Sequence, residues 1–352
     1  MKTKENYIKR CLELAVKGVA LAMPNPSVGA VLVHEGKIIG EGFTSPFGGS
    51  HGEVNCLNSV SLNDRNNISK STLYVSLEPC SHTGKTPPCA NLIIENKIPE
   101  VVIGCVDTFS LVAGKGIKML KEKGIKVTVG VLEQECRESN KRFFTFHEQK
   151  RPFVVLKWAQ TSDKFIAPNK EYHKEERWIT GSLTKELVHK LRSEEMAILV
   201  GKNTVLADDP SLTTRNFPGK NPVRVVIDRK LELWNRREDF VVFDNEVKTI
   251  IINSESDFEE GIHQGLQVEF DLNFIDNLLA KLHKLGIQSV LVEGGAKTLQ
   301  AFVDSGKWDE AYVFENEKKF RNGVKAPHFQ ASVSSSILVG NDSLSVFKNH
   351  AL

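Results

Sequence analysis

The feature that most constrains this 352-residue chain is a pair of short segments containing one histidine, one glutamate and two cysteines. The first segment carries His51 and, two residues later, Glu53; the second, 77–89, reads LEPCSHTGKTPPC and carries Cys80 and Cys89. One imidazole and two thiolates suit a zinc ion, and three protein ligands leave the fourth tetrahedral position open for water. This layout is typical of catalytic zinc sites, because structural sites are closed by four ligands.

The two segments also match the template of zinc deaminases, in which a His-x-Glu half and a Pro-Cys half surround the metal. On this interpretation His51, Cys80 and Cys89 are the ligands. Glu53 takes a proton from the activated water and passes it to a ring nitrogen and the leaving amine. The alternatives are a structural zinc or a fortuitous set of buried cysteines. Either segment alone is weak, and the two together favour the catalytic interpretation.

The length of the chain and the distribution of its cysteines predict two domains, 1–148 and 149–352. All six cysteines lie within the first 136 residues, where a metal or catalytic role is favoured over disulfides. The net charge of +2 gives no electrostatic footprint for nucleic acid. No apolar run is long enough to span a bilayer, and the N-terminus lacks the apolar core of a signal peptide. We therefore expect a cytoplasmic protein without nucleic-acid or membrane partners.

Hydrophobic periodicity predicts alternating strands and helices in both halves, the α/β class with a partly parallel sheet. In the first half we expect helices at 5–22, 53–60, 88–96, 116–123 and 132–142, and strands at 28–33, 38–43, 72–77, 101–105 and 125–129. In the second half we expect helices at 183–192, 275–285 and 297–304, and strands at 153–159, 197–201, 223–228, 240–243, 249–253, 289–292 and 308–314. The strand ending at 201 is expected to run into a polar loop, and the last 25 residues to form one or two edge strands.

Four stretches of the first half carry a closer resemblance: PNPSVGAVLV (24–33), GEGF (40–43), HGE (51–53) and LEPCSHTGKTPPC (77–89). They resemble the deaminase domain of the bifunctional riboflavin-biosynthesis deaminase/reductase family. Within zinc deaminases, the eight-residue gap between the cysteines and the Thr-Pro-Pro before the second one are specific to that group. The resemblance implies a three-layer cytidine-deaminase-like domain with zinc on the three ligands and Glu53 as proton shuttle. It also implies that Asn25, His82 and Lys85 contact a pyrimidine or its ribose phosphate.

The second half contains no Gly-x-Gly-x-x-Gly after a strand, so a Rossmann fold is not indicated. VEGGAKTL (292–299) places two glycines between a buried strand and a helix, where free backbone N–H groups can bind a phosphate. On its own this pattern is more often only a tight turn. Together with KWAQTSD (157–163), WIT (178–180) and the stretch 197–215, it resembles the family's reductase domain. That resemblance implies a dihydrofolate-reductase-like fold that uses NADPH.

The resemblance also implies individual contacts in the second half. The expected cofactor contacts are Ala159, Trp178, Thr204, Asp208, Gly295, Ala296, Lys297 and Thr298. The expected substrate contacts are Lys157, Arg192, Leu212, Arg215 and Glu293, with the arginines binding a phosphate bidentately. The chain departs from the family at Gly52, where Ala is usual, at Thr44, where His is usual, and at Lys164, where Gly is usual.

The function implied is zinc-dependent hydrolytic deamination of 2,5-diamino-6-(ribosylamino)-4(3H)-pyrimidinone 5'-phosphate, followed by NADPH-dependent reduction of the ribosyl group to ribityl. We also expect a homo-oligomer, a dimer or a tetramer. Two alternatives belong to other classes. A deaminase of nucleic acid or free nucleosides would need a basic groove with aromatic platforms, against which the near-neutral charge argues. A non-catalytic zinc scaffold would have no need of Glu53.

Overall fold

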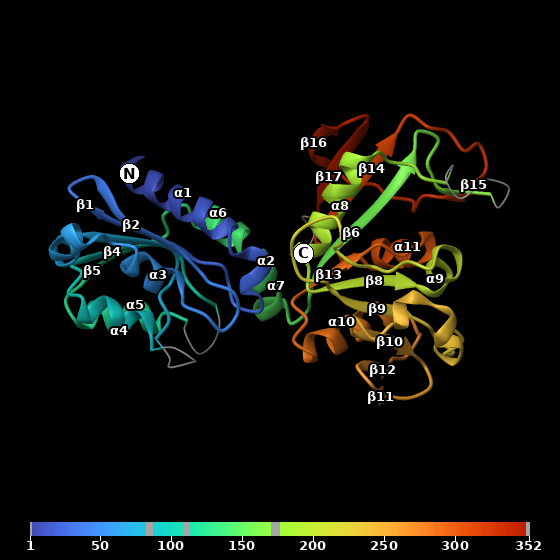
Figure 1. The fold of residues 1–352 in the computed structure, drawn as a ribbon, viewed down its shortest axis with the longest axis horizontal. Coiled ribbons are helices and arrows are strands. Elements are labelled where there is room, and N and C mark those ends of the chain that lie inside the picture. Colours follow the sequence, from blue (N-terminus) through green and yellow to red (C-terminus); the bar gives the residue numbers. More distant parts are fainter. Residues whose placement is uncertain (1, 82–86, 109–112, 170–176, 350–352) are drawn as a thin grey trace. The chain divides into compact units, whose positions relative to one another are not determined.

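The computed structural model describes residues 2–81, 87–108, 113–169 and 177–349, and the chain divides into two compact units, Met1–Gln149 and Lys150–Leu352 (Figure 1). Each unit is built on its own sheet, which confirms the predicted α/β class. No helix among the described residues is long and apolar enough to cross a lipid bilayer.

The first unit contains a five-stranded sheet in the order β2-β1-β3-β4-β5. Its strands are β1 (Gly29–His34), β2 (Lys37–Phe43), β3 (Thr72–Leu77), β4 (Glu100–Cys105) and β5 (Lys126–Val129). β1 pairs antiparallel with β2 and with β3, whereas β3, β4 and β5 are parallel. The carboxyl ends of β3 and β4 therefore lie side by side at one edge of the sheet.

Helices cover both faces of this sheet and complete three layers (Figure 1). One face carries α1 (Lys2–Val16) and α6 (Glu133–Ser139), and the other carries α3 (Gly52–Asn58), α4 (Cys89–Glu95) and α5 (Lys115–Glu122). The remaining elements are α2 (Val19–Ala22), the 3-10 helix η1 (Leu62–Lys70) and α7 (Lys141–Gln149). On α1, the residues that repeat at helical spacing, Ile8, Cys11 and Ala15, are fully buried, as expected for the core-facing stripe.

The second unit contains a ten-stranded sheet in the order β11-β12-β10-β9-β8-β13-β6-β14-β17-β16. Its strands are β6 (Phe153–Thr161), β8 (Ala197–Gly201), β9 (Val223–Ile227), β10 (Thr249–Asn253), β11 (Phe258–Glu260), β12 (His263–Gln267), β13 (Ser289–Val292), β14 (Glu310–Asn316), β16 (Val333–Val339) and β17 (Asp342–Lys348). The run from β12 to β14 is parallel, and the strands at both ends are antiparallel. A separate ribbon pairs β7 (Phe165–Pro168) with β15 (Gly323–Lys325).

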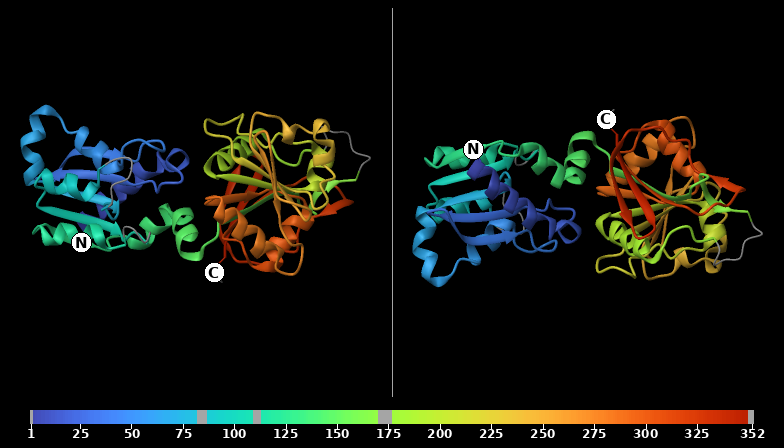
Figure 2. Two further views of the ribbon diagram at one scale, coloured as in Figure 1. Left: turned by 90° about the horizontal axis from the view of Figure 1, so that it is seen from below. Right: turned by 90° about the horizontal axis from the view of Figure 1, so that it is seen from above.

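Alternate residues of the central strands of the second unit face two different helical layers. Val154 and Leu156 pack with α10 (Phe274–Lys284) and α11 (Ala296–Ser305), whereas Val155 packs with α8 (Ser182–Glu194) and α9 (Lys202–Asp208). Figure 2 shows α10 and α11, drawn in orange, on one face of this sheet and α8 on the other. Since both faces are covered, the central strands read as continuous apolar runs.

Two predicted helices are interrupted in the structure. The segment predicted as one helix, 5–22, forms α1 and α2, with a break before Gly18. The segment 132–142 is broken at Asn140, whose side chain accepts a hydrogen bond from Ser27 N at 2.8 Å and donates one to Ser27 O at 3.0 Å. A side chain that bonds the backbone of a distant loop competes with helix continuation.

Two further expectations were wrong. The predicted strand at 240–243 is instead the 3-10 helix η3 (Val241–Phe243), which follows a second one, η2 (Trp234–Asp239). There Val242 O accepts hydrogen bonds from Arg224 and Thr249 side chains, so it is not free to pair in a sheet. The polar loop expected after 201 begins instead with helix α9, which ends at Asp208.

Candidate metal centre and a second polar site

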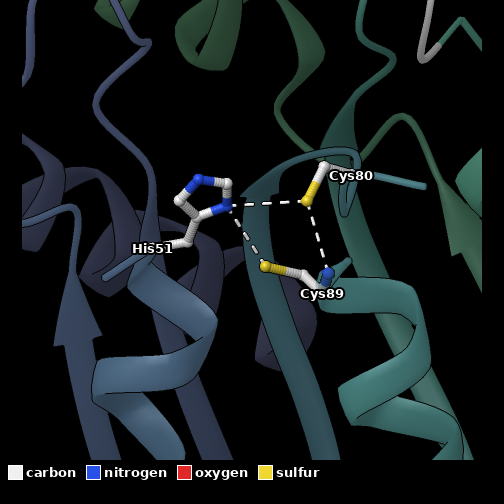
Figure 3. A group of neighbouring side chains, drawn as sticks. All are labelled: His51, Cys80 and Cys89. Atoms are coloured by element: carbon white, nitrogen blue, oxygen red, sulfur yellow. Dashed lines mark hydrogen bonds between the residues drawn. The ribbon is translucent and has the colours of Figure 1, made fainter. Parts of the chain in front are cut away.

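His51, Cys80 and Cys89 converge in the first unit, and their three ligand atoms all lie within 4.8 Å of one another. The Nδ1 atom of His51 lies 3.5 Å from Cys80 Sγ and 3.3 Å from Cys89 Sγ. Figure 3 shows the imidazole and the two sulfur atoms pointing toward one another from the starts of two helices and the loop between them. Among the described residues this is the one cluster of possible metal-ligating groups of this kind.

The donor set and its spacing fit a zinc ion. Around a tetrahedral zinc, a nitrogen at ~2.0 Å and a sulfur at ~2.3 Å from the metal lie roughly 3.5 Å apart. The two observed nitrogen–sulfur distances, 3.3 and 3.5 Å, agree with this geometry. With three protein ligands the site would keep one position for water or substrate, which is the form of a catalytic centre.

Local structure explains how the ligands are placed. His51 immediately precedes α3, and Cys89 is the first residue of α4. Cys80 follows the end of β3, and its sulfur accepts a hydrogen bond from the Cys89 backbone N–H at 3.3 Å. Helix starts of this kind present free N–H groups and partial positive charge, which favour a thiolate.

The protonation of the three groups is consistent with metal binding. Contact with the Cys89 thiol and the His51 imidazole lowers the pKa of Cys80 well below its usual value. The Cys80 sulfur and burial both raise the pKa of Cys89, since the two sulfurs are too close for two uncompensated negative charges. Contact with Cys80 raises the pKa of His51. A divalent cation would supply the charge that allows both sulfurs to be thiolates.

Glu53 lies in the first turn of α3 and is 3% exposed. Burial raises the pKa of its carboxyl to about 7, and the side chain interacts with Cys89. A carboxyl group with a pKa near neutrality can both accept and donate a proton at the same pH. Glu53 therefore interacts with all three residues of the cluster.

Glycine residues allow α3, and with it His51, to lie directly on the β1–β2 hairpin. A Cβ atom on Gly42 would lie 2.2 Å from the Cys56 backbone N, and one on Gly52 would lie 2.4 Å from Val28 O. These contacts are with backbone atoms, which have no side-chain freedom to move away. Gly52 therefore has a packing reason in this chain, although the family resemblance led us to expect Ala there.

For the other residues of the first unit that were singled out from the sequence, the structure shows backbone contacts or gives no description. Asn25 is half-buried, and its backbone N–H bonds Ala22 O at 2.9 Å. Thr44 is buried and accepts a hydrogen bond from Val28 N at 2.9 Å, so its hydroxyl serves the hairpin backbone. His82 and Lys85 lie outside the described residues.

In the second unit, Lys157, Arg192 and Glu293 form a largely buried network. Arg192 Nε and Nη2 donate to the two oxygens of Glu293 at 2.8 and 2.9 Å, and Lys157 Nζ lies 3.5 Å from Glu293 Oε2. The Arg192 edge that was expected to bind a phosphate bidentately is therefore engaged by Glu293. Burial opposes ionisation of Glu293, but the charges of Arg192 and Lys157 outweigh it and lower its pKa to about 2. Two cations and one carboxylate leave the network positively charged.

The loop that follows α9 is held by side chains on several elements. Arg192 Nη1 donates to Thr213 O at 3.1 Å, His189 Nδ1 lies 2.9 Å from the same oxygen, and the buried Arg224 donates from Nε to Ser211 O at 3.0 Å. Within this loop Leu212 is buried with φ +52°, and Arg215 is exposed. Arg215, unlike Arg192, is exposed, and its Nη1 donates hydrogen bonds to the hydroxyls of Ser211 and Thr213 in the same loop.

His189 and Arg224 are supporting residues that the sequence interpretation missed. A signal for Arg224 is present in the sequence, since VRVVI at 223–227 places one cation inside an otherwise apolar strand. Such a charge needs partners when it is buried. Arg224 finds them in Asp244, with Nη1 2.6 Å from Oδ1, and in the carbonyl groups of Ser211 and Val242.

The glycine turn after β13 lies against the start of α9. Thr204 Oγ1 accepts a hydrogen bond from Gly295 N at 2.9 Å, and a Cβ atom on Gly201 would lie 2.5 Å from Thr298 Oγ1. Thr204, Gly295 and Thr298 are thus brought together with the ends of β8 and β13. Ala296 begins α11 and Lys297, in the same helical turn, is exposed.

The other predicted cofactor contacts lie on different elements. Ala159 is on β6 and half-buried, and Trp178 is 59% exposed with Lys185 Nζ 5.0 Å from its ring centroid. Asp208 is exposed at the end of α9. The neighbouring Asp209 accepts a hydrogen bond from Val241 N at 2.8 Å, so one member of this acidic pair has a structural role.

Two family models match the chain, one in each unit. Residues 1–105 match the cytidine and deoxycytidylate deaminase zinc-binding region, and residues 152–316 match the RibD C-terminal domain. The first match contains all three clustered ligand residues and Glu53, and the second contains the network around Glu293.

Whole-chain relatives are similar over nearly the full length. The riboflavin biosynthesis protein RibD of Aquifex aeolicus is 41% identical over 324 residues, which cover 91% of this chain and 88% of the relative. RibD of Actinobacillus pleuropneumoniae is 37% identical, covering 86% of this chain and 81% of the relative. Among solved structures, the diaminohydroxyphosphoribosylaminopyrimidine deaminase/5-amino-6-(5-phosphoribosylamino)uracil reductase of Thermotoga maritima superposes with a TM-score of 0.88 at 37% identity, covering 99% of both chains. Acinetobacter baumannii RibD superposes with a TM-score of 0.86 at 28% identity and the same coverage.

Proposed function

The chain belongs to the RibD family of riboflavin biosynthesis proteins, and from this membership we propose its substrates and the roles of its residues. It is a bifunctional enzyme with a zinc-binding deaminase domain and an NADPH-dependent reductase domain. Its first substrate is 2,5-diamino-6-(ribosylamino)-4(3H)-pyrimidinone 5'-phosphate, which it deaminates. Its second step reduces the ribosyl group to ribityl and gives 5-amino-6-(ribitylamino)uracil 5'-phosphate. The name of the Thermotoga maritima relative supports this pair of substrates.

We assign the deaminase reaction to 1–148, with His51, Cys80 and Cys89 as zinc ligands. The observation that carries this assignment is their convergence within 4.8 Å, beside the buried Glu53. When bound, zinc lowers the pKa of water and so provides a nucleophile at neutral pH. Glu53 takes one proton from that water and delivers it to a ring nitrogen. It then takes the second proton, from the hydroxyl group now bonded to the ring carbon, and delivers it to the amine, which leaves as ammonia. Its pKa of about 7 suits both directions of transfer.

We assign the reductase reaction to 149–352. When bound, NADPH supplies a hydride to the ribosyl carbon, and a proton must reach the ribose oxygen. Ala159, Trp178, Thr204, Asp208 and the turn 295–298 are the proposed cofactor contacts. The positively charged network of Lys157, Arg192 and Glu293 suits an anionic substrate, because opposite charge favours binding where water is excluded.

The phosphate role falls mainly to Arg215, with Leu212 and Arg192 as further substrate contacts. Arg215 is exposed, and its Nη1 bonds the hydroxyl of Ser211 in the same loop. Arg192 bonds Glu293 through Nε and Nη2, so it can offer only its remaining N–H groups to the substrate. Asn25, His82 and Lys85 are the proposed substrate contacts of the deaminase site.

We further propose that the protein works in the cytoplasm as a homo-oligomer, a dimer or a tetramer. The six cysteines are all free, and a reducing compartment keeps zinc-ligating thiols from oxidation. β16 lies at one end of the ten-stranded sheet, and six of its seven residues are exposed, with Leu338 82% exposed. An exposed apolar edge strand is a surface that a second copy could cover.

The test uses the purified full chain, the pyrimidinone substrate and mass spectrometry of the products. With zinc and NADPH we expect loss of one amino group as ammonia and gain of two hydrogens, and without NADPH only the deamination. Glu53→Gln should abolish ammonia release while one zinc per chain stays bound. Normal ammonia release by this variant would refute the role of Glu53, and the absence of any product with the wild-type protein would refute the function.

A further inference from the structure

Glu78 is a buried acidic residue at the end of β3, two positions before the zinc-ligand candidate Cys80, and it is 3% exposed. Its carboxylate accepts four hydrogen bonds from backbone N–H groups. Oε1 accepts from Gly116 N at 3.0 Å and Ile117 N at 3.2 Å, and Oε2 accepts from Gly114 N at 2.9 Å and Asp107 N at 3.3 Å. A single side chain therefore binds the start of α5 and the loop that follows β4.

The backbone next to Glu78 is fixed by the same helix. Glu78 N donates to Cys105 O at 3.0 Å, which continues the pairing of β3 with β4 by one residue. A Cβ atom on Gly116 would lie 2.1 Å from Pro79 O, so α5 packs directly against the peptide group that precedes Cys80. The start of α5 thus contacts this segment twice, through the Glu78 carboxylate and through the Pro79 carbonyl group.

A buried carboxylate that binds backbone N–H groups is often only a structural element, and the second unit contains one. Asp228 accepts hydrogen bonds from Glu232 N, Leu233 N and Trp234 N at 3.0, 2.8 and 3.0 Å. Glu78 differs from Asp228 because it lies next to a candidate metal ligand. Cys80 lies two residues away, and its sulfur is the atom that approaches His51 Nδ1 to 3.5 Å.

We propose that Glu78 is a positioning residue of the metal centre, which holds Cys80 at ligand distance by anchoring the 78–80 segment to the start of α5. The proposal rests on the proposed zinc site. Only Pro79 separates Glu78 from Cys80, so a displacement of Glu78 should also displace Cys80. The tetrahedral geometry of a zinc site tolerates little displacement of one ligand.

The test compares zinc release from the full-length wild type, Glu78→Gln and the matched control Asp228→Asn. Both substitutions replace a buried carboxylate by its isosteric amide, whose NH₂ group cannot accept a hydrogen bond from a backbone N–H. Release into excess chelator is followed at a temperature at which all three proteins are folded by circular dichroism. We expect zinc to leave Glu78→Gln about 10- to 100-fold faster than the wild type, the range typical of lost supporting contacts around a metal. Asp228→Asn should release zinc at the wild-type rate.

Cobalt-substituted protein gives a readout that a loss of stability alone would not change. The visible absorption of Co²⁺ reports the geometry of its ligands, so Glu78→Gln should alter this spectrum and Asp228→Asn should not. If Glu78→Gln does not fold, Glu78→Asp replaces it, since it keeps the charge but shortens the reach by one carbon. Zinc release from Glu78→Asp should then be several-fold faster than from the wild type.

Wild-type rates and an unchanged cobalt spectrum in the folded Glu78 variant would overturn the proposal. That result would not contradict the proposed zinc site itself. Failure of the wild-type protein to bind one zinc per chain would instead overturn the proposed function, so the two failures are distinguishable.

Discussion

The carboxylate of Glu293 and the guanidinium of Arg192 face each other fork to fork, with Nε–Oε1 and Nη2–Oε2 distances of 2.8 and 2.9 Å. Both side chains are largely buried, and Lys157 Nζ approaches the same carboxylate at 3.5 Å. The bidentate geometry that would suit a phosphate is thus satisfied inside the protein. This pairing assigns Glu293 two tasks, since it fixes Arg192 and balances two buried cations.

Replacing Glu293 by Gln should destabilise the second unit strongly, because two buried cations would lose their counter-charge. Breaking a buried pair from one side costs about 3–5 kcal/mol. Chemical denaturation of the variant and of the wild type measures this difference. Glu260→Gln serves as control, because Glu260 is exposed and ion pairs at the surface contribute less than about 1 kcal/mol. Equal losses in the two variants would contradict the buried network.

The same carboxylate predicts a dependence of stability on pH. The pKa of Glu293 is lowered from 4.5 to about 2 in the folded protein, because its cationic partners outweigh burial. A group with a depressed folded pKa stabilises the protein above its unfolded pKa, and this stability is lost as the pH falls toward the folded pKa. The wild-type protein should therefore lose this contribution between about pH 4.5 and pH 2. Glu293→Gln should lack this part of the acid-induced loss in denaturation curves recorded across that range.

Replacing Gly42 by Ala should push α3 away from the hairpin, since the new methyl group would meet the Cys56 backbone at 2.2 Å. Overpacking of this kind costs typically ~1–3 kcal/mol. Because His51 directly precedes α3, the variant should also release zinc faster into a chelator. Gly36→Ala is the control, since Gly36 has φ +77° and open space around it, so that only backbone strain is added. Zinc release at the same rate in both variants would contradict the link between α3 packing and the metal site.

Lys164 has a left-handed backbone conformation, with φ +66°. This conformation favours glycine, which is the residue expected at this position from the family resemblance. Its side chain forms an ion pair with Glu315. Lys164→Ala and Lys164→Gly both lose this pair, but only Gly adopts a left-handed φ without steric cost. Lys164→Gly should therefore be more stable than Lys164→Ala by roughly 1 kcal/mol. Denaturation of the two variants measures the difference, and a more stable Lys164→Ala would rule out backbone strain at this turn.

The metal site could be predicted from the sequence because its residues lie in two short segments at the ends of regular elements. The apolar periodicity of the flanking strands and helices places these ends, and the residue types determine the chemistry. The pairing of β3 with β4 and the glycine contacts of α3 then bring the segments together. Residues that support the site from a distance, such as Glu78, carry no pattern of this kind, since their partners are backbone groups near residues 107–117.

The candidate site of the second unit depends on long-range polar contacts, which local sequence patterns do not predict. The Arg192–Glu293 pair joins residues 101 positions apart, and no periodicity shows that one will engage the other. The 3-10 helix at Val241–Phe243 has the apolar composition of a strand, yet Arg224 and Asp209 bind its backbone from other elements. Local propensity cannot report such competition, because the competing groups are distant in sequence.

The hydroxyl of Thr204 should determine how tightly the glycine turn binds NADPH, because it accepts the Gly295 N–H at 2.9 Å. Thr204→Val keeps the shape of the side chain but leaves that N–H without an acceptor, which costs about 1–3 kcal/mol. Since the turn is a proposed cofactor contact, the Kd for NADPH should rise by about 5- to 150-fold. This ratio corresponds to the loss of about 1–3 kcal/mol of binding free energy. Fluorescence titration with NADPH measures this change, and ammonia release by the deaminase site should stay at the wild-type rate. Thr204→Ser retains the hydroxyl and should bind NADPH nearly as tightly as the wild type. A Kd for Thr204→Val equal to that of Thr204→Ser would show that the hydrogen bond to Gly295 has no part in cofactor binding.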